Sequence, residues 1–185
     1  MKYLLVLAAI LGIIAVGSAN SFATTGTDPI YMKYGTIQGD VTDKAYQNAI
    51  ELTSFQFGVA RQVTGATGSG STSAPTVSEI TITKPMDSSS PALLQQAFGG
   101  TPQTAEIYFV TASGTGTEVV YAEYKLTNAI VTGYSVSSGG DRPTESLSLA
   151  FSKIQFEYKS PSTTGTSTGT GTGTVTWDLT QQKLS

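Results

Sequence analysis

The chain has 185 residues and a formal net charge of −3, and it contains neither histidine nor cysteine. It therefore lacks the usual ligands of zinc, copper and non-haem iron, every catalytic triad built on histidine or cysteine, and any disulfide. The acidic balance argues against a nucleic-acid partner.

The first segment has the pattern of a secretory signal peptide. Lys2 supplies a positive charge, residues 4–16 form an uncharged apolar run that is short for a spanning helix, and Ser21 and Ala23 are small residues at the positions that a signal peptidase reads. We predict cleavage after Ala23, with cleavage after Ala19 and an uncleaved anchor as the alternatives. The expected product is a single domain, residues 24–185, that is secreted or periplasmic and does not insert into the membrane.

The first half of this domain alternates strands with polar segments. Residues 30–34 and 50–60 predict two strands that flank a protruding polar loop at 35–46. The tract 64–76 is rich in Gly, Ser and Thr and predicts a mobile loop. Residues 79–84 predict a strand with one buried face, which ends at Pro85.

One short helix is predicted at about residues 91–98. Ser90 is placed to cap it, Pro91 suits the first helical position, and Gly99 ends it. Its apolar residues form one stripe, which predicts that the helix lies on a sheet or barrel mouth. The stripe consists of Leu93, Leu94, Ala97 and Phe98.

The second half is again β-rich, with strands predicted at 105–111, 119–126, 129–137 and 146–158. In the last of these, apolar residues occupy odd positions up to Phe151 and even positions from Ile154. An extra residue near Ser152 should therefore form a bulge, which bends a strand as a closing barrel requires. The Gly/Ser/Thr tract 160–174 predicts a flexible segment, and Trp177 lies in a final, edge-seeking strand at 175–178.

No constellation of side chains predicts catalysis. The closest acidic pair, Asp40 and Asp43, lies in a turn-forming segment, and spacing alone does not place two carboxylates across a substrate. The spaced acidic and amide ligands of a calcium loop are absent from this segment. We therefore expect no catalytic, metal-binding or cofactor-binding residues, no cofactor, and no enzyme.

Several segments, in order, carry a resemblance to a known family. They lie at residues 30–33, 37–40, 49–59, 83–87, 91–94, 121–126, 130–135, 141–145, 151–154 and 156–158, with an echo at 176–178. Together they resemble the Hcp (haemolysin-coregulated protein) family, the tube subunits of type VI secretion systems. The order of the segments, and their coverage of nearly all of residues 30–158, make the resemblance specific.

The resemblance implies a mainly all-β fold, a β-barrel-like pair of packed antiparallel sheets with one short flanking helix. It implies a homo-oligomer, a hexameric ring that can stack into a tube, with type VI spike, sheath and effector proteins as partners. Small effectors would be carried in the lumen, without catalysis. It further implies that the loop 35–46 reaches the adjacent ring, with Asp40, Asp43 and Lys44 as candidate contacts.

The family-like turn consists of Asp141, Arg142, Pro143, Thr144 and Glu145. The guanidinium of Arg142 is expected to order the turn by bonding a carboxylate or a carbonyl. A role for Arg142 at a subunit boundary is the second interpretation, because arginine is enriched in interfaces.

The signal peptide departs from the family pattern, since typical members lack one. A chain that enters the export pathway unfolded cannot assemble inside a cytoplasmic sheath, so rings are expected in the periplasm or outside the cell. Two alternatives stay open from the sequence. One is an exported β-barrel binding module for an effector, a glycan or a surface partner, outside any type VI apparatus. The other is a hydrolase that uses carboxylates alone, which would need two acidic residues converging across a cleft.

Overall fold

The computed structural model describes residues 28–64, 71–112, 118–160 and 171–185, so the predicted signal segment 1–23 lies outside the described residues. In chain order the elements are β1 (Ile30–Tyr34), β2 (Ile50–Leu52), β3 (Ser54–Gln56), β4 (Val59–Ala60), β5 (Val63–Thr64), β6 (Ser71–Thr72), β7 (Thr76–Val77), β8 (Ile80–Pro85), α1 (Ser90–Gly99), β9 (Gln103–Ala112), β10 (Glu118–Ser137), β11 (Thr144–Ala150), β12 (Lys153–Lys159), β13 (Gly171–Asp178) and β14 (Lys183–Leu184).

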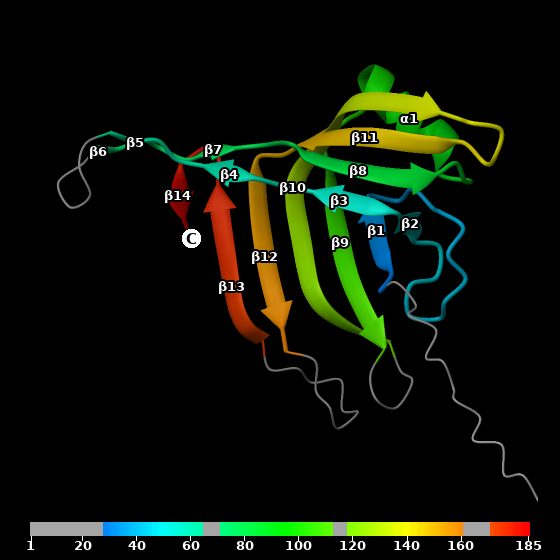
Figure 1. The fold of residues 1–185 in the computed structure, drawn as a ribbon, viewed down its shortest axis with the longest axis horizontal. Helices are drawn as coiled ribbons and strands as arrows, with labels where there is room; N and C mark the ends of the chain where they lie inside the picture. The colour runs from blue at the N-terminus through cyan, green and yellow to red at the C-terminus, as the bar shows by residue number, and fades with distance from the viewer. Residues whose placement is uncertain (1–27, 65–70, 113–117, 161–170) are drawn as a thin grey trace, which may run out of the picture.

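Two antiparallel sheets share the long strand β10 (Figure 1). The first sheet has the order β2-β1-β9-β10-β12-β13-β14, and the second has the order β10-β11-β8-β3. Figure 1 shows the strands of the first sheet crossing the direction of β8 and β11. The predicted all-β, barrel-like pair of sheets with one flanking helix is thus confirmed.

The two sheets meet at a corner where β10 bends instead of ending. The break predicted at 127–128 is a register shift between Leu126 and Ala129 within one strand of 20 residues, with Asn128 in the left-handed region at φ 53°. Across the corner, the Ser152 amide donates to the Thr127 carbonyl over 3.0 Å, and the Asn128 side-chain amide donates to the Ser152 hydroxyl over 3.0 Å. These bonds join the corner of β10 to the short link between β11 and β12.

The structure confirms the change of phase predicted near Ser152. The prediction that residues 146–158 form a single strand is wrong. The chain forms β11, which pairs with the second half of β10, and then β12, which pairs with its first half. The extra residue therefore does more than bulge a strand, because it is the point where the chain passes from the second sheet to the first. The predicted strand 50–60 also divides, with β2 in the first sheet and β3 in the second.

The two Gly/Ser/Thr tracts are partly paired. Within the described part of 64–76, β6 and β7 form short hairpins with β5 and β4. Within the described part of 160–174, β13 already begins at Gly171 and pairs with β12. Backbone pairing in a sheet needs no apolar side chain, so composition alone concealed these strands.

The core lies between the two sheets and follows the period of two. Inward residues of β1, β8, β9 and β11 are buried, while their neighbours face out. Complete burial of such a side chain stabilises the fold by about 1.5–3 kcal/mol. The core side chains without measurable exposure include Met32, Ile50, Ile80, Ile82, Ile107, Leu126 and Leu149.

The helix forms where predicted, with two corrections. Ser90 is not its cap: the N-cap is Ser89, which makes no side-chain capping bond. The apolar stripe does not all face the sheet either, because Leu93 is buried whereas Phe98 is 84% exposed. With 3.6 residues per turn, Leu93 and Ala97 share the core-facing side, and Phe98 is turned about 100° away from Ala97.

Candidate functional site

The loop between β1 and β2 is built on the outer face of the first sheet. The Gly39 amide donates to the Asn48 carbonyl over 2.9 Å, and the Asn48 amide donates to the Val41 carbonyl over 2.8 Å. A side chain at Gly39 would collide with the Ala49 carbonyl oxygen, so this close approach requires glycine. The loop is closed by Tyr46, whose ring stacks on Tyr31 with centroids 4.7 Å apart.

The structure brings Asp40 together with Arg142, which lies 102 residues away in the sequence. Arg142 Nη2 is 3.4 Å from Asp40 Oδ2, and Arg142 Nε donates to the Met86 carbonyl over 2.6 Å. The Ser88 amide donates to Asp40 Oδ1 over 3.4 Å, and contacts with Ser88 followed by the charge of Arg142 lower the pKa of the Asp40 carboxyl. Arg142 thus bonds both a carboxylate and a carbonyl, and joins the loop to the segment before α1.

The other two loop residues lie apart from this contact. Asp43 Oδ1 accepts a hydrogen bond from the Ala45 amide over 2.8 Å, which shapes the turn at the tip of the loop. Lys44 is exposed and forms no ion pair with any residue that the structure describes. Of the three predicted contacts, Asp40 serves the base of the loop, and Asp43 and Lys44 occupy its tip.

The predicted turn 141–145 consists of the end of the connection between β10 and β11 and the first two residues of β11. Asp141 and Thr144 are exposed, the Ser138 hydroxyl donates to the Asp141 carbonyl over 3.0 Å, and the Pro143 carbonyl accepts a bond from the Met86 amide over 2.8 Å. Glu145, by contrast, is completely buried. The turn therefore has an outer part, which holds the loop through Arg142, and an inner end inside the fold.

A buried charge network, missed by the sequence analysis, surrounds Lys84. Its Nζ donates to Glu145 Oε2 over 2.8 Å, to Asp87 Oδ1 over 2.7 Å and to the Ser90 hydroxyl over 3.2 Å, and both Lys84 and Glu145 have no exposed side-chain surface. The Tyr134 hydroxyl donates to Glu145 Oε1 over 2.7 Å. The network connects β8, β10, β11 and the start of α1.

The environment of Glu145 favours its charged form. Burial by itself raises its pKa, but hydrogen bonds from Lys84, Ser90 and Tyr134 and the charge of Lys84 together lower it below its ordinary value. Burial, followed by the bond to Glu145, raises the pKa of Tyr134 to about 12. At neutral pH the carboxylate is therefore ionised and the phenol is its donor.

The alternation of the strands held a signal for this network. Lys84 continues the even-numbered series of Ile80 and Ile82, and Glu145 continues the odd-numbered series of Leu147 and Leu149. Each charge therefore falls on the buried face of its strand, and β8 and β11 pair with Lys84 opposite Glu145.

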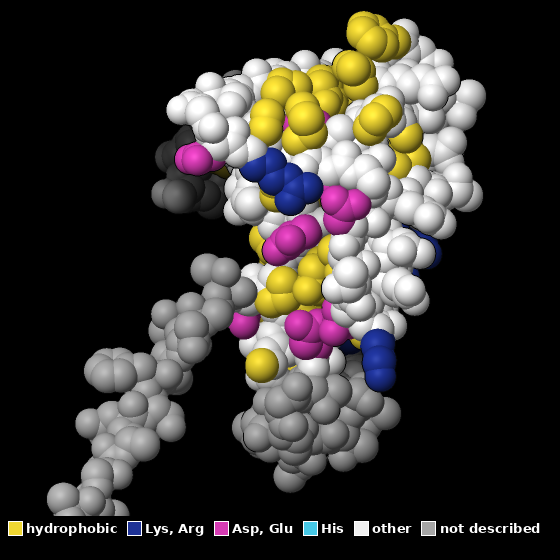
Figure 2. Space-filling model, turned by 90° about the vertical axis from the view of Figure 1, so that its right-hand side faces the viewer, with side chains coloured by type: hydrophobic (Ala, Val, Ile, Leu, Met, Phe, Trp, Pro, Cys, Tyr) yellow, Lys and Arg dark blue, Asp and Glu magenta, His cyan; other side chains and the backbone are white. Residues whose placement is uncertain are grey.

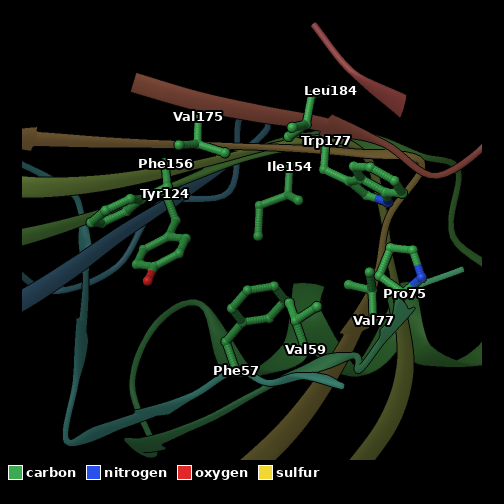
Figure 3. Close-up of a pocket in the computed structure, with 10 residues that line it drawn as sticks. All are labelled: Phe57, Val59, Pro75, Val77, Tyr124, Ile154, Phe156, Val175, Trp177 and Leu184. Carbon is green, nitrogen blue, oxygen red and sulfur yellow. The ribbon is translucent and has the colours of Figure 1, made fainter. Parts of the chain in front are cut away.

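A second feature is an apolar pocket at the far end of the first sheet (Figure 3). It has a volume of about 200 Å³ and lies between β12, β13 and β14 on one side and the β4–β7 hairpin on the other. Figure 3 shows Tyr124, Phe156 and Trp177 on the sheet side and Phe57 and Val59 on the hairpin side. Such walls offer a binding place for an apolar group and no chemistry for catalysis.

Metal-binding clusters are likewise missing from the part of the chain that the structure describes, where no three acidic side chains converge. The same described residues contain no helix that is long and apolar enough to cross a membrane.

The family model described as type VI secretion system effector, Hcp, matches residues 31–158. The chain belongs to the Hcp family. The match begins in β1 and ends in β12, so it includes the second sheet, the first sheet without β13 and β14, α1, the loop and the buried network. Among curated proteins, none matches the chain.

Solved structures of Hcp proteins share this fold. A structure described as a type six secretion system protein is 28% identical, with a TM-score of 0.75, and the match covers 85% of this chain and 99% of that one. Hcp1 from Salmonella typhimurium is 24% identical, with a TM-score of 0.68 and coverage of 85% and 98%. Hcp1 from E. coli EAEC 042 is 22% identical, with a TM-score of 0.68 and coverage of 82% and 98%.

The first prediction concerns the Lys84–Glu145 pair. Lys84→Met leaves two carboxylates without their cation and is expected to lower the free energy of unfolding by about 3–5 kcal/mol. The double variant Lys84→Met/Glu145→Leu should recover part of this loss, because no buried charge of the pair is left alone. Urea unfolding at one fixed protein concentration measures both.

The matched control for this prediction is Lys125→Met. Lys125 pairs with Glu106 over 2.7 Å, but its side chain is 46% exposed, so the expected loss is only about 0–1 kcal/mol. Equal losses for Lys84→Met and Lys125→Met would contradict a structural role for the buried pair.

The second prediction concerns acid stability. Because the pKa of Glu145 is lowered in the fold, its stabilisation is complete above the ordinary value of 4.5 and is lost as pH falls through the folded-state pKa. Glu145→Gln should therefore be less stable at neutral pH and lose less stability between neutral pH and acid. Thermal unfolding measured from pH 7 to pH 3 tests this.

Glu118 provides a control, because its pKa is shifted in the direction opposite to that of Glu145. Burial, followed by the charge of Asp43, raises its pKa, so Glu118→Gln should not reduce the loss of stability in acid. An unchanged pH profile for Glu145→Gln would show that the carboxylate is not held in its charged form by Lys84.

Proposed function

We propose that this chain is an exported structural subunit that assembles into hexameric rings, and that these rings stack into a tube of the Hcp type. Membership in the Hcp family assigns the chain to type VI secretion as a tube protein. The observation that carries the proposal is the match to a type six secretion system protein over 99% of that protein's length. A match of that extent leaves none of the related domain unaccounted for.

The arrangement of charges supports a structural role rather than catalysis. The completely buried ions, Lys84 and Glu145, are bonded to each other inside the fold and do not open onto a cleft. We therefore propose that the chain is not an enzyme. An exported binding module outside a type VI apparatus is less favoured, because the family match covers residues 31–158, most of the domain.

The loop between β1 and β2 is proposed as the contact between rings. Its base is held to the turn before β11 by the Asp40–Arg142 pair, so the tip with Asp43 and Lys44 is presented from a supported base. Exposed charges of this kind contribute little energy singly but define orientation and partner. Spike, sheath and effector proteins remain proposed partners of the assembled tube.

The third prediction is that the purified chain forms six-fold rings. Electron microscopy together with mass determination should show hexamers, and stacked rings at high concentration. Lys44→Glu should keep the rings but reduce stacking, because it reverses the charge at the tip of the loop, and Gln181→Glu at the exposed C-terminal turn should stack as the unaltered chain does. A monomer that persists at high concentration would refute the ring.

The fourth prediction tests export. When the chain is produced with residues 1–23, the mature protein recovered outside the cytoplasm should begin at Thr24, as mass spectrometry of the intact chain would show. Ala23→Leu should block this cleavage or move it to Ala19, whereas Ala19→Leu should leave it unchanged. Recovery of the full-length chain only in the cytoplasm would contradict export and leave the ring proposal intact.

A further inference from the structure

Phe98 is a large apolar side chain on the outside of the molecule. It lies near the C-terminal end of α1 and is 84% exposed, although the same helix buries Leu93 completely. Figure 2 shows hydrophobic side chains gathered at the upper end of the face on which α1 lies. Single exposed apolar residues are common, so exposure alone assigns no partner.

The apolar pocket supplies a surface of matching size and chemistry. Three residues of its lining, Val59, Val175 and Leu184, are themselves 57%, 54% and 67% exposed, so the pocket is open to the outside. Its volume is about 200 Å³, and an apolar cavity of about 150 Å³ is enough for a benzene ring. An apolar wall cannot hold ordered water well, because each water needs two to four polar partners.

The two features lie on opposite flanks of one molecule. In Figure 1, α1 is at the right, while the β4–β7 hairpin and β14, which border the pocket, are at the left. Phe98 therefore cannot fill the pocket of its own chain, but a neighbouring copy can present it. A contact between two different patches of identical chains is heterologous, and repeated contacts of this type generate closed rings or open filaments.

We propose that Phe98 of one copy inserts into the apolar pocket of the next copy, and that this contact joins neighbouring subunits within a ring. The inference rests on the proposed ring and names its two surfaces. The aromatic side chains Tyr124, Phe156 and Trp177 surround the inserted ring, and Val59 and Leu184 close over it. Buried aromatic anchors in such pockets dominate interface energies.

The expected effect of Phe98→Ser is a weakening of association by on the order of 30-fold or more, the usual size for a central anchor. Since Phe98 is exposed in the single chain, the variant should keep the melting temperature of the isolated monomer. Val175→Glu, which places a charge at the rim of the pocket, should weaken association in the same way from the other side of the contact.

Cross-linking identifies the two surfaces directly, because the chain has no cysteine of its own. Phe98→Cys and Val59→Cys, each alone, should give no covalent dimer under mild oxidation. At a protein concentration high enough to offset the loss of the phenyl group in Phe98→Cys, a mixture of the two should give a disulfide-linked dimer, and the double variant a ladder of covalent oligomers. Ser137→Cys, an exposed position on β10, is the matched control and should not cross-link with Val59→Cys.

Each outcome separates this inference from the ring itself. Intact rings of Phe98→Ser, or cross-links formed within either single variant alone, would overturn the Phe98 contact and leave the ring standing. Failure of the unaltered chain to assemble would remove both. If the dye ANS fills the pocket of assembled rings at the stoichiometry seen for monomers, the pocket is open in the ring and the inference is wrong.

Discussion

The fold depends on one constraint, which is that β10 must belong to two sheets at once. A strand of 20 residues cannot pair flat along its whole length with neighbours that run in crossing directions, so it bends where its register shifts. At the bend, Ser152, in the link between β11 and β12, donates to the Thr127 carbonyl with both its amide and its hydroxyl, so this backbone acceptor is satisfied. The two sheets can then face each other and enclose the core.

A chain of polar contacts leads from this core to the surface loop. Lys84 donates a hydrogen bond to Asp87 just before α1. The carbonyl of the neighbouring Met86 accepts a bond from Arg142, which also pairs with Asp40. The buried end is costly to desolvate and is maintained by several bonds at once, whereas the outer end is solvated and weak. The inner network therefore fixes position, and the outer pair transmits that position to the loop proposed to contact the adjacent ring.

The distribution of buried charges and exposed apolar side chains also bears on function. In the part of the chain that the structure describes, the fully buried charges of Lys84 and Glu145 are paired with each other, whereas several large apolar side chains are exposed. The exposed phenyl group on α1 and the aromatic pocket on the opposite flank are surfaces for association. Surfaces for association agree with a family whose members form tubes, and here they consist of Phe98 and the residues that line the pocket.

The sequence by itself determined the class of fold, the place of the helix, the change of phase near Ser152 and the family, because alternation is a local property and the order of motifs is contained in the linear chain. The sequence also places Lys84 and Glu145 in the inward-facing phase of their strands. Only the tertiary structure decided that β10 continues through Asn128, that Phe98 faces outward, and that Asp40 meets Arg142. Pairing between segments far apart in the chain depends on packing geometry, which no local pattern records.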